Sequence, residues 1–98
     1  MRKFRVFIEG KNFIINSETG PERLGFFATR YVEARDDREA EVKALNLIRN
    51  DKSLTSDVLN KKDAAPMLYV QEIVELVSFT GTNVPGAGYS LYPMNDQD

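Results

Sequence analysis

One segment, residues 37–50, carries the pattern of an amphipathic helix and constrains the fold more than any other part of the chain. Asp36 and Glu39 have the spacing of a capping box, and Asp37 adds negative charge where the helix dipole favours it. Apolar residues then recur at helical spacing: Ala40, Ala44, Leu45, Leu47 and Ile48. The sequence therefore predicts one helix that buries a single apolar face.

The residues before this helix alternate between apolar and polar, which is typical of strands. One strand is predicted over residues 3–10, with residues 13–15 as a candidate continuation beyond an irregularity at 10–12. A second strand is predicted over residues 25–34, and its apolar groups on both faces indicate a central position in a sheet. Turn-forming residues at 16–23 predict a connecting loop that is too long for a tight hairpin turn.

Residues 67–79 allow two interpretations. Val, Ile, Tyr and Phe dominate the segment, and Pro66 and Gly81 bracket it, which favours a strand. Its apolar residues also fit a helical period, so a helix is the alternative. A bulge near residues 71–72 would explain why the apolar face changes along the segment. We take the strand as the prediction.

Shorter elements complete the chain. Thr55 or Ser56 is a candidate cap for a single turn that carries Val58 and Leu59 inward. The other predicted segments are a glycine-rich loop at 81–88, an edge strand at 89–93 and a frayed tail at 94–98. The glycine-rich loop leads into a strand and not into a helix, so a phosphate-binding role is not predicted for it.

These elements predict a single α+β domain over residues 1–98. The expected architecture is a two-layer sandwich, in which one main helix covers one face of a four-stranded, mainly antiparallel sheet in the order β-β-α-β-β. A right-handed crossover from the second strand to the third would place the third beside the first. The other face would carry Phe, Tyr and Val side chains, and burial against a second copy of the chain would cover them.

Composition excludes several classes of function. The chain has no cysteine and no histidine, which excludes disulfides, thiolate zinc sites and the usual nucleophilic triads. We expect neither a metal nor a cofactor. The net charge of −2 and the pI near 5.2 argue against a nucleic-acid partner. No stretch approaches the ~20 apolar residues that a membrane helix needs, so a cytoplasmic location is expected.

Candidate site residues gather where the second strand meets the helix. Arg30 shares its strand parity with Phe26 and Val32, so its guanidinium is expected among apolar neighbours. There it needs a carboxylate partner or an anionic ligand. Glu33 and Glu72 are the candidate internal partners, and a structural ion pair is the favoured interpretation. The alternative is a ligand-binding site made by Arg30, Tyr31, Arg35 and Glu72.

Four stretches stand out together: residues 25–34 with Glu39-Ala40-Glu41, residues 48–60, residues 69–73 and residues 88–93. They resemble a family of small bacterial proteins that has no assigned activity. The resemblance implies a shared fold and no catalytic motif. Glu39-Ala40 and Ala44-Leu45 give a looser likeness to HicB-type antitoxins. That likeness is confined to the fold, because the Pro/Gly stretch and the DNA-binding tail of such proteins are missing.

The first hypothesis from the sequence is a non-catalytic bacterial interaction module that forms a homodimer through the open sheet face or an edge strand. One alternative is a nucleic-acid-binding or antitoxin-like protein that uses Arg2, Lys3, Arg5 and Arg30. A second alternative is a small-molecule enzyme that works without histidine or cysteine, through Glu72, Glu75, Arg30 or Tyr31. The sequence indicates no ligand, protein partner or pathway.

Overall fold

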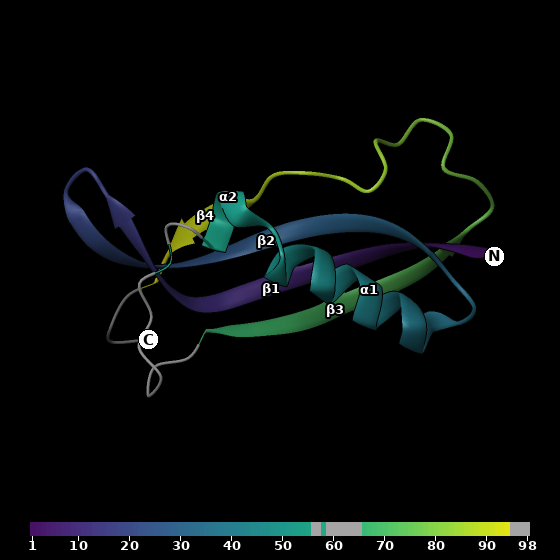
Figure 1. Ribbon diagram of the computed structural model, residues 1–98, viewed down its shortest axis with the longest axis horizontal. Coiled ribbons are helices and arrows are strands. Elements are labelled where there is room, and N and C mark those ends of the chain that lie inside the picture. Colours follow the sequence, from purple (N-terminus) through teal and green to yellow (C-terminus); the bar gives the residue numbers. More distant parts are fainter. Residues whose placement is uncertain (56–57, 59–65, 95–98) are drawn as a thin grey trace.

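A four-stranded antiparallel sheet with two helices makes up the protein, shown in Figure 1 as a computed structural model that describes residues 1–55, 58 and 66–94. The elements are β1 (Arg2–Ser17), β2 (Gly20–Ala34), α1 (Asp37–Arg49), α2 (Lys52–Thr55), β3 (Met67–Leu76) and β4 (Ser90–Pro93). The predicted α+β class is confirmed, and α2 is an addition to the predicted order of elements. The strands lie in the order β3-β1-β2-β4, so β3 lies beside β1, the neighbour expected from the sequence.

β1 and β2 form a long hairpin. Its register shifts between Gly10 and Phe13, where the sequence predicts an irregularity. Beyond that point the strands stay paired as far as Gly20, which leaves a two-residue turn at 18–19. The loop predicted over residues 16–23 is therefore wrong. Gly20 closes the turn with a φ of +109°, a conformation that only glycine adopts without steric cost.

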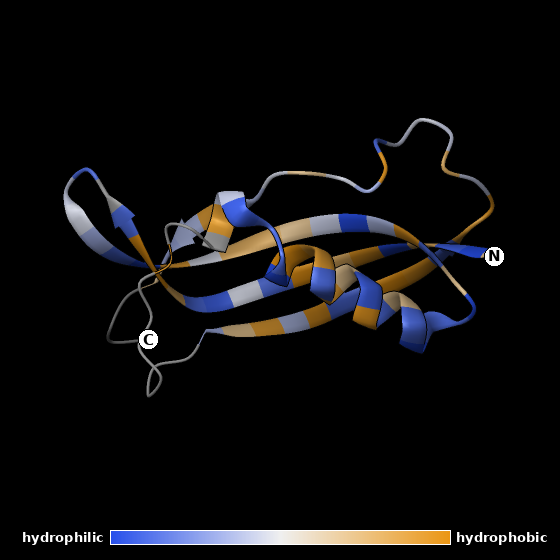
Figure 2. Cartoon of the chain, in the orientation of Figure 1, coloured by the Kyte–Doolittle hydropathy of each residue, from blue (hydrophilic) through white to orange (hydrophobic). Residues whose placement is uncertain are grey.

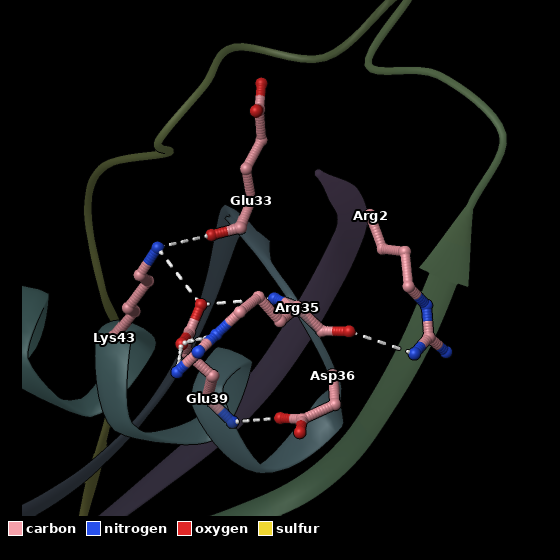
Figure 3. A network of polar contacts seen from close by, with 6 residues as sticks. All are labelled: Arg2, Glu33, Arg35, Asp36, Glu39 and Lys43. Carbon is pink, nitrogen blue, oxygen red and sulfur yellow. Dashed lines mark hydrogen bonds and ion pairs between the residues drawn. The ribbon is translucent and has the colours of Figure 1, made fainter.

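α1 begins at the predicted cap. The Asp36 Oδ1 accepts a hydrogen bond from the backbone N–H of Glu39 at 2.8 Å (Figure 3). The Glu39 carboxylate accepts from the backbone N–H of Arg35 at 3.1 Å, one residue before the position that a capping box uses. Asn50 is the C-terminal cap. The helix predicted at 37–50 is confirmed.

The core lies between α1 and one face of the sheet. α1 contacts β1, β2 and β3, and bands of hydrophobic and hydrophilic residues alternate along it (Figure 2). It buries Ala40, Ala44 and Ile48. The buried apolar residues of β1 and β2 in this region are even-numbered: Phe4, Val6, Ile8, Phe26, Ala28, Val32 and Ala34. The odd-numbered residues beside them face away from α1 because side chains alternate along a strand.

β3 and β4 form the two edges of the sheet. The register between β1 and β3 shifts at Gln71, so the predicted bulge is confirmed and the helical alternative for this segment is wrong. β3 ends at Leu76, three residues before the predicted end. β4 is the predicted edge strand. Three predicted features lie outside the described residues: the turn at Ser56, the inward Leu59 and the tail at 95–98.

α2 begins earlier than the turn that the sequence predicts. The Asp51 Oδ1 accepts hydrogen bonds from the backbone N–H and the hydroxyl of Ser53, at 3.0 and 2.7 Å. This contact caps the first turn of α2. Leu54 is then buried in the core. The cap is thus an aspartate that the sequence analysis did not assign to a second helix.

Candidate functional site

The open face is the side of the sheet that points away from α1. Its residues are Arg5, Phe7, Glu9, Phe27, Thr29, Tyr31, Tyr69, Glu72, Val74 and Tyr92. At its centre the rings of Phe7 and Phe27 stack in nearly parallel planes, with centroids 5.5 Å apart. The ring of Tyr92 lies 5.4 Å from that of Phe27. These three rings form an aromatic platform on β1, β2 and β4.

The glycine-rich loop belongs to a connection, residues 77–89, that joins the two edges of the sheet (Figure 1). The connection is fastened to the outer edge of β2, because the Tyr31 backbone N–H donates to the carbonyl of Pro85 at 2.8 Å. The ring of Phe79 also lies edge-on to the Tyr31 ring, at 6.2 Å. Gly86, with a φ of +94°, comes so close that an added Cβ would lie 2.7 Å from a β2 carbonyl oxygen. Glycine permits this approach.

The connection and the open face together form an open pocket of about 480 Å³. Its lining comprises Phe7, Phe27, Ala28, Thr29 and Tyr31 from the sheet, and residues 81–83 and 86–90 from the connection and the start of β4. No charged side chain is among these described lining residues. Rings and neutral polar groups line the pocket, and such a lining suits an uncharged ligand.

Arg30 lies behind this pocket, on the α1 side of β2, and is 3% exposed. Its guanidinium donates to the carbonyl oxygens of Thr29 at 2.8 Å and Gly88 at 3.2 Å. It also lies over the Tyr89 ring, 5.0 Å from the ring centroid. Arg30 therefore holds the connection against β2 through backbone carbonyls, in place of the carboxylate partners that the sequence suggested.

The four predicted ligand-binding residues do not meet in one place. Tyr31 lines the pocket, whereas Arg30 is buried on the other face of the same strand. Arg35 forms an i, i+4 ion pair at 2.8 Å at the start of α1. Glu72 accepts from Arg5 at 3.4 Å on the open face, so it does not serve Arg30. Adjacent strand positions point to opposite faces, and that alternation separates the set.

A polar network lies where α1 begins (Figure 3). Lys43 Nζ donates to the backbone carbonyl of Glu33 at 2.8 Å, and the Glu33 carboxylate points away from α1 in that view. Glu33 is therefore not the partner of Arg30. Arg2, drawn in the same view, also forms an ion pair with Glu75 at 2.7 Å. Glu75 thus joins β3 to β1 through Arg2, as Glu72 does through Arg5.

The pocket residues that the sequence analysis missed are the aromatic ones and their neutral neighbours. The sequence analysis expected phenylalanine side chains on the uncovered face but assigned neither Phe7 nor Phe27 to a site, and Thr29 and Asn83 were not singled out. The available signal was strand parity, which places Phe7, Phe27 and Thr29 on one face. No local pattern in the sequence indicates that the connection brings Asn83 to the pocket.

Two tyrosines donate to carboxylates. The Tyr89 hydroxyl donates to Asp51 Oδ2 at 2.6 Å. Burial, followed by this hydrogen bond, raises the pKa of Tyr89 to about 12, and the same bond is the main cause of a lowered pKa at Asp51. On the open face the Tyr92 hydroxyl donates to Glu9 Oε2 at 2.5 Å, which raises the pKa of Tyr92 to about 12. Both bonds need the protonated phenol.

Two of the four tyrosines are therefore expected to ionise near pH 12 in an ultraviolet absorbance titration of the folded protein. The stabilisation that each phenol provides is complete below its ordinary pKa of 10.0 and is lost as pH rises through about 12. Tyr89→Phe and Tyr92→Phe should each remove one late ionisation step. Retention of both late steps in either variant would contradict the assigned hydrogen bonds.

Among residues 1–55, 58 and 66–94, no group of three or more Asp or Glu side chains is arranged to hold a metal ion. In the same part of the chain, no helix is both long and apolar enough to span a membrane. Comparisons of the chain with protein-family models, with characterised proteins and with solved structures found no match.

Proposed function

We propose that the protein is a non-catalytic interaction module that pairs with a second copy of itself through its sheet. The proposed contact combines the outer edge of β3 with the adjoining β1–β3 half of the open face, which α1 leaves uncovered in a two-layer arrangement. The observation that carries the proposal is the exposure of Met67 and Tyr69, 49% and 42%, on an edge strand. An edge strand offers a row of backbone donors and acceptors to a partner strand.

The charges near β3 support a second copy as the partner. Glu72 accepts from Arg5 at 3.4 Å, and Arg2 pairs with Glu75 at 2.7 Å. The Arg5–Glu72 pair lies on the open face and the Arg2–Glu75 pair lies on the other face of the same edge, so each of these charges has an opposite charge beside it. A surface of this kind can meet its own copy across a twofold axis without strong like-charge repulsion.

A nucleic-acid partner receives less support. Of the four basic residues that the sequence analysis named for it, Arg2 and Arg5 form ion pairs and Arg30 is buried, which leaves Lys3 as the remaining cation of the set. Phosphate contacts need exposed cations, and a buried guanidinium that already donates to two carbonyls does not supply one.

Catalysis also receives less support. Glu72 lies opposite Phe7 and Glu75 lies opposite Phe4, so the two carboxylates fall on opposite faces of β3 and each binds an arginine. Of the four residues named for an enzyme, Tyr31 is the one in the described lining of the pocket. The four residues named for an enzyme therefore do not bring an acid and a base together in one place.

Size-exclusion chromatography with light scattering tests the self-association. The chain has a mass of 11.1 kDa, so the proposal expects a particle of about 22 kDa, twice that value. Val74→Lys should shift this particle to the monomer mass. The contact would bury a new ammonium beside Arg5, its cross-strand neighbour in the same chain, and like charges would then meet across the interface.

Val42→Lys is the matched control. Val42 is 53% exposed on α1, and its replacement should leave the dimer intact. A wild-type mass of one chain at every concentration tested would refute the proposal. Equal dissociation by both lysine variants would place the contact elsewhere and would also refute it.

A further inference from the structure

We propose that the pocket between the connection 77–89 and the open face binds an uncharged planar heteroaromatic ring, of the class that nucleosides contain. This inference goes beyond the proposed self-association, because the described lining of the pocket includes no residue of β3. The proposed contact is centred on β3 and the pocket on β2, with Phe7 of β1 between them, so a variant on β3 and a variant on β2 test the two sites separately.

The sheet side of the pocket favours a planar ligand. The rings of Phe7 and Phe27 lie within 2° of parallel, and both line the pocket together with Tyr31. Phe27 is 36% exposed, so part of this residue is accessible to a ligand. A flat ring can extend a stack of this kind, whereas a puckered or branched ligand contacts less of it.

The polar groups of the pocket favour an uncharged ligand that both donates and accepts hydrogen bonds. The lining residues include Asn83, whose amide has both functions, and Thr29 and Ser90, which carry hydroxyls. The Thr82 hydroxyl donates to the Phe79 carbonyl at 2.6 Å, which leaves its oxygen as an acceptor. A charged ligand would lose hydration here without meeting a counter-charge. The edges of a nucleobase carry donors and acceptors side by side, which matches this set.

The loop side of the pocket is already held in position. Arg30 donates to the Gly88 carbonyl at 3.2 Å, and the Tyr31 N–H donates to the Pro85 carbonyl at 2.8 Å. A ligand therefore does not have to order this part of the wall, and that lowers the entropic cost of binding. The volume of about 480 Å³ falls within the range of roughly 300–1,000 Å³ that is usual for small-molecule sites.

An NMR titration of the whole chain with adenosine and with cytidine tests the proposal. We expect saturable shifts at millimolar ligand that are confined to the amides of Phe7 and of residues 27–31, 81–84 and 86–90. Phe27→Leu should weaken binding about tenfold, because stacking on an aromatic ring is lost. Asn83→Ala, at an exposed loop position, should weaken it several-fold without risk to the fold. Tyr69→Leu, which changes an aromatic residue of the open face outside the pocket, is the matched control and should bind as the wild type does.

Three outcomes would overturn the inference: no shifts with either nucleoside, shifts centred on β3, or equal weakening by Phe27→Leu and Tyr69→Leu. Ribose should cause no shifts, because it has no planar ring. The nucleoside monophosphates should bind no more tightly than the nucleosides, and a large gain from the phosphate would contradict the uncharged character of the site. Val74→Lys should bind nucleoside normally, so failure of the dimer and failure of this site give different results.

Discussion

Replacing Phe26 by alanine is expected to lower the free energy of unfolding by about 3–5 kcal/mol, the usual loss for a buried phenylalanine. Phe26 is 0% exposed, and its ring contacts those of Phe13 at 5.0 Å and Tyr89 at 4.9 Å. An added Cβ at Gly10 would overlap the same ring, which shows how closely this part of the core is packed. The loss should appear in urea denaturation followed by far-ultraviolet circular dichroism.

Phe27 is the matched control, since it neighbours Phe26 in the sequence and points to the opposite face. It is 36% exposed, so Phe27→Ala should cost only about 1–2 kcal/mol. Should Phe26→Ala show no cooperative transition, Phe26→Leu is expected to fold with a loss of about 1–2 kcal/mol. Equal losses at the two positions for alanine would contradict the assignment of faces.

Replacing Arg30 by methionine is expected to cost about 2–4 kcal/mol, because two part-buried hydrogen bonds from a buried guanidinium are lost. The acceptors are the carbonyls of Thr29 and Gly88, and methionine keeps most of the buried stem of the side chain. The same variant should speed hydrogen exchange at the Tyr31 amide, whose partner is the Pro85 carbonyl on the connection that Arg30 holds. Denaturation and exchange rates together check the result.

Arg35→Met serves as the comparison. The Arg35 side chain is 80% exposed and pairs with Glu39 at 2.8 Å, so its loss should cost less than about 1 kcal/mol. It should leave the exchange rate at Tyr31 unchanged. Identical stability losses for the two methionine variants would show that Arg30 does not have the buried bridging role described above.

Much of the secondary structure follows from short patterns. The cap at Asp36, the apolar stripe of α1 and the alternation on β1 and β2 each lie within a few residues, and each predicted its element. The bulge at Gln71 also left a local trace, as a change in the apolar face of β3. The prediction of a loop at 16–23 was wrong because its turn-forming residues suit a strand end as well as a loop. Pairing between β1 and β2 selects the strand.

The candidate site was less predictable. Arg30, Tyr31 and Arg35 lie close together in the sequence but not in the same site. Side chains alternate along β2, so Arg30 is buried and Tyr31 lines the pocket, whereas Arg35 forms an ion pair at the start of α1. The pocket instead joins Phe7 to residues 81–90, which are more than seventy positions away in the chain. Nothing local in the sequence of the connection shows that it returns along β2.

Periodicity and capping residues in the chain were thus sufficient for the class of fold and for α1. These features depend on contacts within one turn or one strand, which a linear pattern records. The partners of Arg30, the path of residues 77–89 and the pocket depend on contacts between distant segments. Such contacts are selected by packing of the whole chain, so they became visible only in the folded protein.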